Sequence, residues 1–265
     1  MVELKDIKVF SSDWKNALKD RLNGQAAELV IVQVGNVEAS NRYVRNKLKD
    51  CDNVGIWGRL RQYPEDITQI ELEKEIKNIV NNERPHGIIV QLPLPEHIDK
   101  DAIAQLIPPD MDVDGFRHDS WYKPCTPLGI MKYLEYCGFQ FSGSNVVVIG
   151  RSDIVGKPMA KMLLDADATV TLCHSKTRNL YDFTMGADLI VCAVGKPKFL
   201  NCYPLHMPII DVGINFNDEG KLCGDCFNTE NRNVTPVPGG VGLLTRCALL
   251  ENVVQSMEKR KKYEN

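Results

Sequence analysis

The chain has 265 residues, of which 25% are charged, and its formal net charge is −3. A chain of this length buries a sizeable core without disulfide or metal staples, as one large or two modest domains. Because acidic and basic residues are interspersed, no broad basic field forms, which argues against nucleic-acid binding and favours small-molecule partners.

Strand and helix patterns alternate along the chain. In order, we predict a helix at 13–23, a strand at 29–34, helices at 39–50 and 67–81, strands at 87–90 and 146–149, a helix at 157–166, strands at 169–172, 189–194 and 209–212, and a helix at 244–261. Continuous apolarity is typical of strands buried on both faces, and the alternation with helices predicts parallel sheets of βαβ units. We therefore predict an α/β fold with a second, nucleotide-binding unit that begins near Trp121.

No targeting or metal-binding pattern is evident. Residues 1–6 lack the apolar run of a signal peptide, and no stretch approaches the roughly 18 apolar residues that span a bilayer, so we expect a cytoplasmic protein. The nine cysteines are typical of reduced thiols, and the lone CxxC of Cys223 and Cys226 has no second pair or His partner at zinc-finger spacing. Residues 110–115 open like a calcium loop, but Trp121 stands where a bidentate glutamate is required. We predict no metal site.

A glycine-containing loop at 150–158 follows one predicted strand and precedes a helix whose first turn tolerates Pro158. It does not match the usual G-x-G-x-x-G, yet free backbone amides at such a helix start suit a pyrophosphate. We expect cofactor contacts here from Gly150, Arg151, Ser152, Ile154 and Gly156.

The strand that follows carries no acid at its end, where an NAD enzyme would bind the ribose hydroxyls. Ser175 and Lys176 stand there instead, and with Arg151 they offer the hydroxyl and cations expected around a 2′-phosphate, which favours NADP. His174 is more typical of a packed or capping histidine than of a catalytic base. Two later strand ends add Gly195 and Ile214, either as cofactor contacts or as plain turns.

Candidate catalytic side chains lie in the first half of the chain. Tyr43 and Lys47 are four residues apart on a predicted helix, so they share one face. A lysine acts as a base at neutral pH only if its surroundings depress its pKa. Gln91 leaves a strand at its carboxyl end and could orient Lys47 without adding charge. An exposed helix surface for the first two, and a loop cap for Gln91, remain alternatives.

Residues 235–242 form a proline-framed loop that contains three glycines, Gly239, Gly240 and Gly242. Such a run is costly to order unless its backbone must approach something closely, because glycine loses the most conformational freedom on folding. A binding loop is favoured over an ordinary tight turn.

Five motifs, at 43–47, 90–95, 112–115, 150–156 and 235–242, occur in one order and closely resemble the methylenetetrahydrofolate dehydrogenase/cyclohydrolase family over nearly the whole chain. The resemblance implies an N-terminal folate-binding domain (1–120 with 243–265), a Rossmann-like NAD(P)-binding domain (121–242) and a cleft between them. It further implies that Tyr43 stacks on the folate, that Lys47 beside Gln91 transfers protons, and that Asp114 holds the pterin, with Asp112 structural. Substrate contacts are then expected from Pro236, Val237, Gly239 and Gly240.

The implied activity is NADP-dependent oxidation of 5,10-methylenetetrahydrofolate to the methenyl form and its hydrolysis to 10-formyltetrahydrofolate, by a homodimer joined through the nucleotide domains. Alternatives are a monofunctional or NAD-dependent dehydrogenase, and a catalytically silent folate or dinucleotide-binding module. One departure stands out: the family loop usually continues Gly-Pro-Met-Thr, whereas this chain has Leu243 and Leu244 before Thr245. We expect Thr245 to cap the last helix.

Overall fold

The computed structural model describes residues 2–201, 203, 206–227, 229 and 233–264. The chain forms two compact units, each with its own parallel sheet. The three-stranded unit comprises Asp13–Cys125 and the chain from Arg246 onward, and the four-stranded unit comprises the chain up to Ser12 and Thr126–Thr245. Helices α1 (Ile7–Leu22) and α8 (Val241–Glu264) contribute residues to both units.

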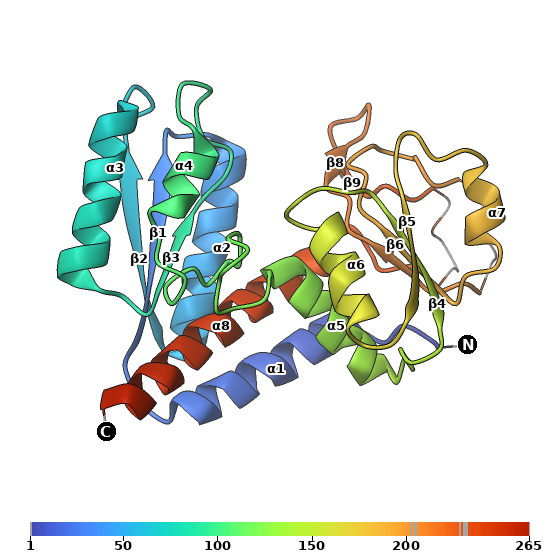
Figure 1. The fold of residues 1–265 in the computed structure, drawn as a ribbon, viewed down its shortest axis with the longest axis horizontal. Coiled ribbons are helices and arrows are strands. Elements are labelled where there is room, and N and C mark those ends of the chain that lie inside the picture. The colour runs from blue at the N-terminus through green and yellow to red at the C-terminus, as the bar shows by residue number, and fades with distance from the viewer. Residues whose placement is uncertain (1, 202, 204–205, 228, 230–232, 265) are drawn as a thin grey trace. The chain divides into compact units, whose positions relative to one another are not determined.

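The three-stranded unit is a layered α/β structure (Figure 1). Its sheet has the order β2-β1-β3, and all neighbours are parallel. Alternate residues of β1 and β3 face a core built with α3 and α4, while Gly58 of β2 lies against Leu48 and Cys51 of α2 on the other side. The elements are β1 (Ala27–Val34), α2 (Glu38–Val54), β2 (Ile56–Tyr63), α3 (Gln69–Asn78), a π-helical turn (Ile79–Glu83), β3 (Gly87–Val90) and α4 (Lys100–Gln105).

The four-stranded unit has the parallel order β5-β4-β6-β7, with α6 and α7 on opposite sides of the sheet (Figure 1). One sheet face packs on α5 and α6, and the other packs on Leu200, Tyr203 and Met207. The elements are α5 (Cys125–Cys137), β4 (Asn145–Ile149), α6 (Gly156–Leu164), β5 (Thr169–Cys173), α7 (Leu180–Thr184), β6 (Leu189–Cys192) and β7 (Ile209–Asp211), followed by a small hairpin of β8 (Asn215–Phe216) and β9 (Leu222–Cys223).

The predicted parallel α/β architecture is confirmed, and every predicted strand is present within a few residues. Two larger elements were missed for physical reasons. Strand β2 lies at the sheet edge, where all its residues after Ile56 are half-buried or exposed, and it has no continuous apolar run. Helix α5 contains Pro127 and Gly129, which lower helix propensity, and its helical path is set by packing in the core.

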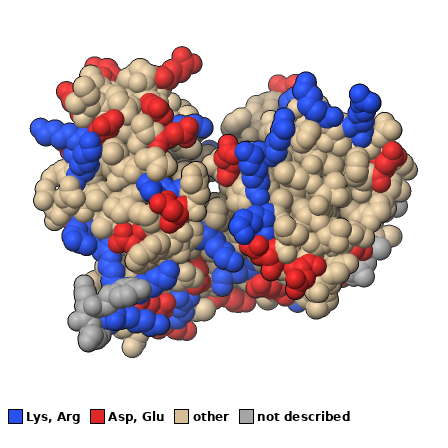
Figure 2. All heavy atoms as spheres, viewed as in Figure 1, with Lys and Arg blue, Asp and Glu red and all other residues tan. Residues whose placement is uncertain are grey.

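Charges of both signs are mixed on the face of each unit that Figure 2 shows. No helix within the described ranges is long and apolar enough to cross a membrane.

Candidate active site

The carboxyl end of β3 brings Gln91 to Lys47. The Lys47 Nζ donates a hydrogen bond of 3.0 Å to Gln91 Oε1, and the Gln91 Nε2 donates to the carbonyl of Leu92 at 2.7 Å. The Gln91 amide therefore contacts the lysine through its oxygen and caps a loop carbonyl through its nitrogen. Its backbone N–H donates to Val32 of β1 at 2.8 Å, which fixes its place at the sheet edge.

Helix α2 presents Tyr43 and Lys47 on one face. Both side chains are half-buried, while Val44 and Cys51 are buried on the face that packs on the sheet. This amphipathic division leaves the ring and the amine on the side that the sheet does not cover.

The segment after α4 carries Asp112 and Asp114. Asp112 is buried and accepts backbone N–H groups of Phe116 and Arg117, which makes it a structural residue. Burial raises the pKa of its carboxyl. Burial also raises the pKa of the Cys125 thiol, with the negative charge of Asp114 adding to the rise and the positive charge of Lys47 opposing it. Both charges thus lie near this one thiol.

The proline-framed loop that begins at Thr235 lies in the four-stranded unit. Gly239 has φ +94°, and a Cβ on Gly240 would stand 2.1 Å from the carbonyl oxygen of Pro236, so both positions favour glycine. Pro236 is exposed and Val237 half-buried. The Thr235 hydroxyl accepts the Asp211 N–H at 2.8 Å and anchors the loop to β7.

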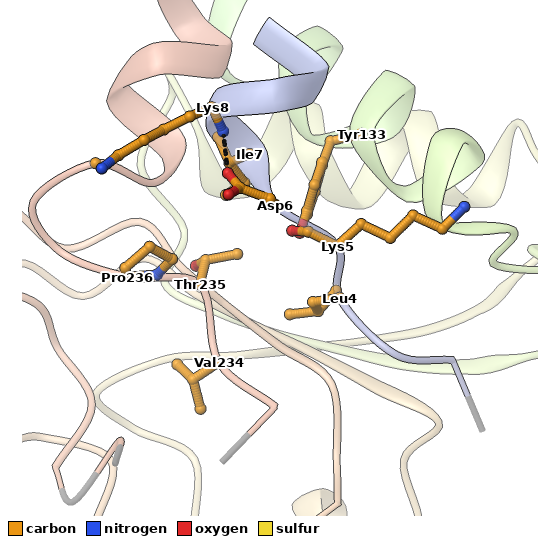
Figure 3. Close-up of a pocket in the computed structure, with 10 residues that line it drawn as sticks. Leu4, Lys5, Asp6, Ile7, Lys8, Tyr133, Val234, Thr235 and Pro236 are labelled. Atoms are coloured by element: carbon orange, nitrogen blue, oxygen red, sulfur yellow. Dashed lines mark hydrogen bonds between the residues drawn. The ribbon is translucent and has the colours of Figure 1, made fainter. Parts of the chain in front are cut away.

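A cavity of about 350 Å³ lies behind this loop (Figure 3). The chain before α1 forms one wall, and Tyr133 of α5 closes it by donating to the carbonyl of Lys5 at 2.6 Å. Lys8 extends from α1 beside the loop, with its Cε 3.8 Å from where a Cβ on Gly239 would stand.

Gly150 and Gly156 shape the turn between β4 and α6. A Cβ on Gly150 would stand 2.1 Å from the Ala193 carbonyl oxygen, and a Cβ on Gly156 would stand equally close to that of Gly150. These glycines therefore permit backbone to pack on backbone. Ser152 caps the helix start by accepting the N–H groups of Val155 and Gly156, both at 3.3 Å.

The polar side chains expected around a 2′-phosphate are exposed. Gly150 N–H donates to Cys173 O at 2.9 Å, so the turns after β4 and β5 start from neighbouring points of one sheet edge. Arg151, Ser175 and Lys176 are exposed there, and no side-chain hydrogen bond or ion pair joins them to another described residue. The His174 Nδ1 accepts the Lys176 N–H at 3.1 Å, which is a capping role.

Gly195 and Asn215, the residue after Ile214, are held by a buried carboxylate that the sequence did not predict. Asp225 is fully buried and accepts N–H groups of Val194, Gly195 and Lys196, at 2.6, 3.0 and 2.9 Å, and the side-chain amide of Asn215 at 2.9 Å. Gly195 has φ +73° with open space around it, and Ile214 is 52% exposed. In the sequence, Asp225 was noted only as one of the two residues between the cysteines of the CxxC pair.

The first cysteine of the CxxC pair lies in β9. Cys223 and Cys226 are free and half-buried. Within the described ranges no three His, Cys, Asp or Glu side chains come together as metal ligands.

Two family models cover the chain. Residues 6–114 match the tetrahydrofolate dehydrogenase/cyclohydrolase catalytic domain, and residues 124–261 match the NAD(P)-binding domain of the same family. The chain belongs to the tetrahydrofolate dehydrogenase/cyclohydrolase family. Lys47, Gln91 and Asp114 therefore lie within the matched catalytic domain, and the loops after β4 and β5 lie within the matched NAD(P)-binding domain.

Full-length relatives agree with these models. The chain is 43% identical over 273 residues to the bifunctional protein FolD of Lysinibacillus sphaericus, covering 96% of each. It superposes with a TM-score of 0.90 on the bifunctional FolD dehydrogenase/cyclohydrolase of Campylobacter jejuni, at 40% identity over 96% of this chain and 98% of that one. The Trypanosoma brucei dehydrogenase-cyclohydrolase, solved with NADP and an inhibitor, has a TM-score of 0.88 at 32% identity, over 98% of this chain and 99% of that one.

Proposed function

We propose that this chain oxidises 5,10-methylenetetrahydrofolate with NADP+ and hydrolyses the methenyl product to 10-formyltetrahydrofolate. The observation that carries the proposal is the 3.0 Å hydrogen bond from Lys47 Nζ to Gln91 Oε1, within the matched catalytic domain. A silent binding module would have no need of an amine aligned by a neutral amide at a ligand-binding sheet edge.

The four residues of the three-stranded unit have separate tasks. The Tyr43 ring stacks on the folate, and the Asp114 carboxylate accepts the ring N–H and amino groups of the pterin. Lys47 takes a proton from the water that attacks the methenyl carbon. When the bond between that carbon and the ring nitrogen breaks, Lys47 returns the proton to the nitrogen. Gln91 keeps the amine aimed and adds no charge that would stabilise its protonated form.

The four-stranded unit offers groups that fit NADP. The N–H groups of Val155, Gly156 and Lys157 are already bonded to Ser152, so the proposed pyrophosphate contacts come from the loop before α6 and not from the helix start. Arg151, Ser175 and Lys176 are exposed donors without competing side-chain partners among the described residues. NADP+ held by these groups would supply the hydride acceptor for oxidation of the methylene carbon. Gly195 and Ile214 border the cofactor, and Pro236, Val237, Gly239 and Gly240 form a loop that closes over the folate.

We also propose that the chain acts as a cytoplasmic homodimer. The support is a set of exposed phenylalanines in the four-stranded unit, Phe199, Phe216 and Phe227, which are 40%, 62% and 38% exposed. Sedimentation of the purified chain tests the dimer: a monomer at micromolar concentration contradicts it.

An absorbance assay separates the proposed function from its alternatives. Purified chain is mixed with 5,10-methylenetetrahydrofolate and either NADP+ or NAD+, while reduced cofactor and methenyl product are followed together. We expect NADPH to form and the methenyl signal to stay low because it is hydrolysed. Methenyl accumulation would indicate a monofunctional dehydrogenase, faster reaction with NAD+ would overturn the cofactor, and no reaction would indicate a silent module.

A further inference from the structure

Asn252 of α8 joins the two ends of the segment that carries Asp114. Its Nδ2 donates to the carbonyl of Val113 at 2.8 Å and to the carbonyl of Lys123 at 3.0 Å. Val113 precedes Asp114, and Lys123 lies two residues before Cys125, so one side-chain amide closes a long loop at both ends.

The Asn252 side chain acts here as a hydrogen-bond donor. Asn252 is 1% exposed, and its Oδ1 has no hydrogen-bond partner within the described residues. A buried acceptor without a partner carries a free-energy penalty that an apolar side chain of similar shape would avoid. The two N–H bonds to Val113 and Lys123 account for an amide at this position.

The residues that Asn252 contacts also contact the neighbours of Asp114. Cys125 donates its thiol to the Val113 carbonyl at 3.3 Å, and the Asn252 Nδ2 lies 3.6 Å from that sulfur. The Cys125 N–H donates to the Asp114 carbonyl at 3.3 Å. A Cβ on Gly115 would stand 2.6 Å from the Pro124 nitrogen, so the two sides of the loop touch directly.

The geometry points to Asn252 as a positioning residue for the folate site, acting through Asp114. This inference rests on the proposed role of Asp114 as the pterin acceptor. Loss of the amide leaves the carbonyls of Val113 and Lys123 without that donor and frees Val113 to move, and Asp114 moves with its neighbour. A displacement of about 1 Å at a binding carboxylate is enough to cost up to a hundredfold.

Asn252→Leu tests the inference, because leucine has a similar volume and no donors. The dissociation constants for tetrahydrofolate and for NADP+ are measured by calorimetry, together with the melting temperature. We expect the folate constant to rise about tenfold and the NADP+ constant to stay unchanged, because the NADP+ groups lie in the other unit. An equal rise in both dissociation constants would overturn the inference, because a general loss of folded protein weakens the binding of both ligands.

Ser256→Ala is the matched control. Ser256 lies one turn further along α8, is 1% exposed, and donates its hydroxyl to the carbonyl of His86 at 2.6 Å, with a longer contact of 3.5 Å to the carbonyl of Asp110. Its short bond is a comparable buried tether to the segment before β3, and it does not contact Val113 or Lys123. We expect it to lower the melting temperature while leaving the folate constant unchanged. A folate constant that rises as much as in Asn252→Leu would contradict a specific role for Asn252.

A double-mutant cycle with Asp114→Ala separates this inference from the proposed function. If Asn252 acts through Asp114, Asn252→Leu has little further effect on folate binding once Asp114 is alanine. A full tenfold effect in that background overturns the inference and leaves Asp114 in place. An Asp114→Ala variant that binds folate normally overturns the role of Asp114, and the inference with it. Should Asn252→Leu fail to fold, Asn252→Ala, which leaves room for water at the two carbonyls, carries the same comparison.

Discussion

Lys47 Nζ donates to Gln91 Oε1 at 3.0 Å, and the same Gln91 amide is held by the carbonyl of Leu92. The second bond decides which end of the amide faces the lysine, because a carbonyl accepts only from the nitrogen. The lysine therefore meets a neutral acceptor, which aligns it without the charge that would strongly favour its protonated form.

Replacing that neutral acceptor by a carboxylate is expected to slow hydrolysis. In Gln91→Glu an ion pair replaces the neutral hydrogen bond to the Lys47 amine, so the amine is held more tightly and kcat for methenyl hydrolysis should fall. Gln62→Glu, in strand β2 of the same sheet, is the control, because among the described residues the Gln62 side chain bonds the Gly35 carbonyl, at 2.9 Å, and not the lysine. An unchanged kcat in Gln91→Glu would show that Lys47 does not limit the step.

Cofactor choice is expected to depend on Arg151. A charge-assisted phosphate contact contributes about 1.5–3 kcal/mol, so Arg151→Ala should reduce the NADP+ over NAD+ preference in kcat/KM by roughly ten- to a hundredfold. Lys157→Ala is the matched control, because Lys157 lies in the same loop-to-helix segment but is paired with Asp153 at 2.6 Å. Equal efficiency with both cofactors in the wild type would contradict the assignment.

Leu243→Pro restores the residue that the family usually has after this loop. Leu243 lies in the first turn of α8, a region where proline φ is accommodated, but its N–H donates to Gly240 O at 2.9 Å and proline removes that bond. Because the lost bond offsets the gain from a more restricted unfolded chain, we expect a melting temperature that changes little and folate binding tighter by at most about 1 kcal/mol. Ala248→Pro, inside the same helix, should destabilise by about 3 kcal/mol. If Leu243→Pro unfolds or loses folate, the loop does not have the assigned role.

Stability is expected to fall in mild acid partly because of His86. Its Nδ1 accepts the Glu28 N–H at 3.1 Å, and burial, with Arg260 nearby, lowers its pKa from 6.5 to about 4. Between pH 6.5 and about pH 4, His86 is protonated in the unfolded chain but not in the folded chain. The free energy of unfolding therefore declines as the pH falls through this window. His86→Asn keeps an acceptor and removes the titration. Urea unfolding at several pH values should show a shallower decline, and an identical slope would exclude His86 as a source.

The sequence predicted those parts that repeat a local pattern. Buried strands such as β3, and the shared helix face of Tyr43 and Lys47, follow from periodicity alone. Tertiary packing determines the features that the sequence did not predict. The last helix begins at Val241 and not at 244, because Gly240 ends the loop, so Thr245 lies inside the helix. The expectation that Thr245 caps it was wrong: its hydroxyl donates back to the Val241 carbonyl at 3.1 Å. Asp225 and Asn252 gave no sequence signal, because their partners are distant backbone groups.

The central claim is that Lys47 moves the protons in hydrolysis of the methenyl carbon, and one measurement tests it most directly. Purified Lys47→Met, Lys49→Met and wild type are each given 5,10-methenyltetrahydrofolate, and its disappearance is corrected for the uncatalysed rate. Lys49 is an exposed residue of the same helix and serves as the control. We expect Lys47→Met to fold, to bind NADP+ and to lose at least about a hundredfold in hydrolysis, as removal of a general acid–base does. Hydrolysis by Lys47→Met at near the wild-type rate would remove Lys47 from the mechanism.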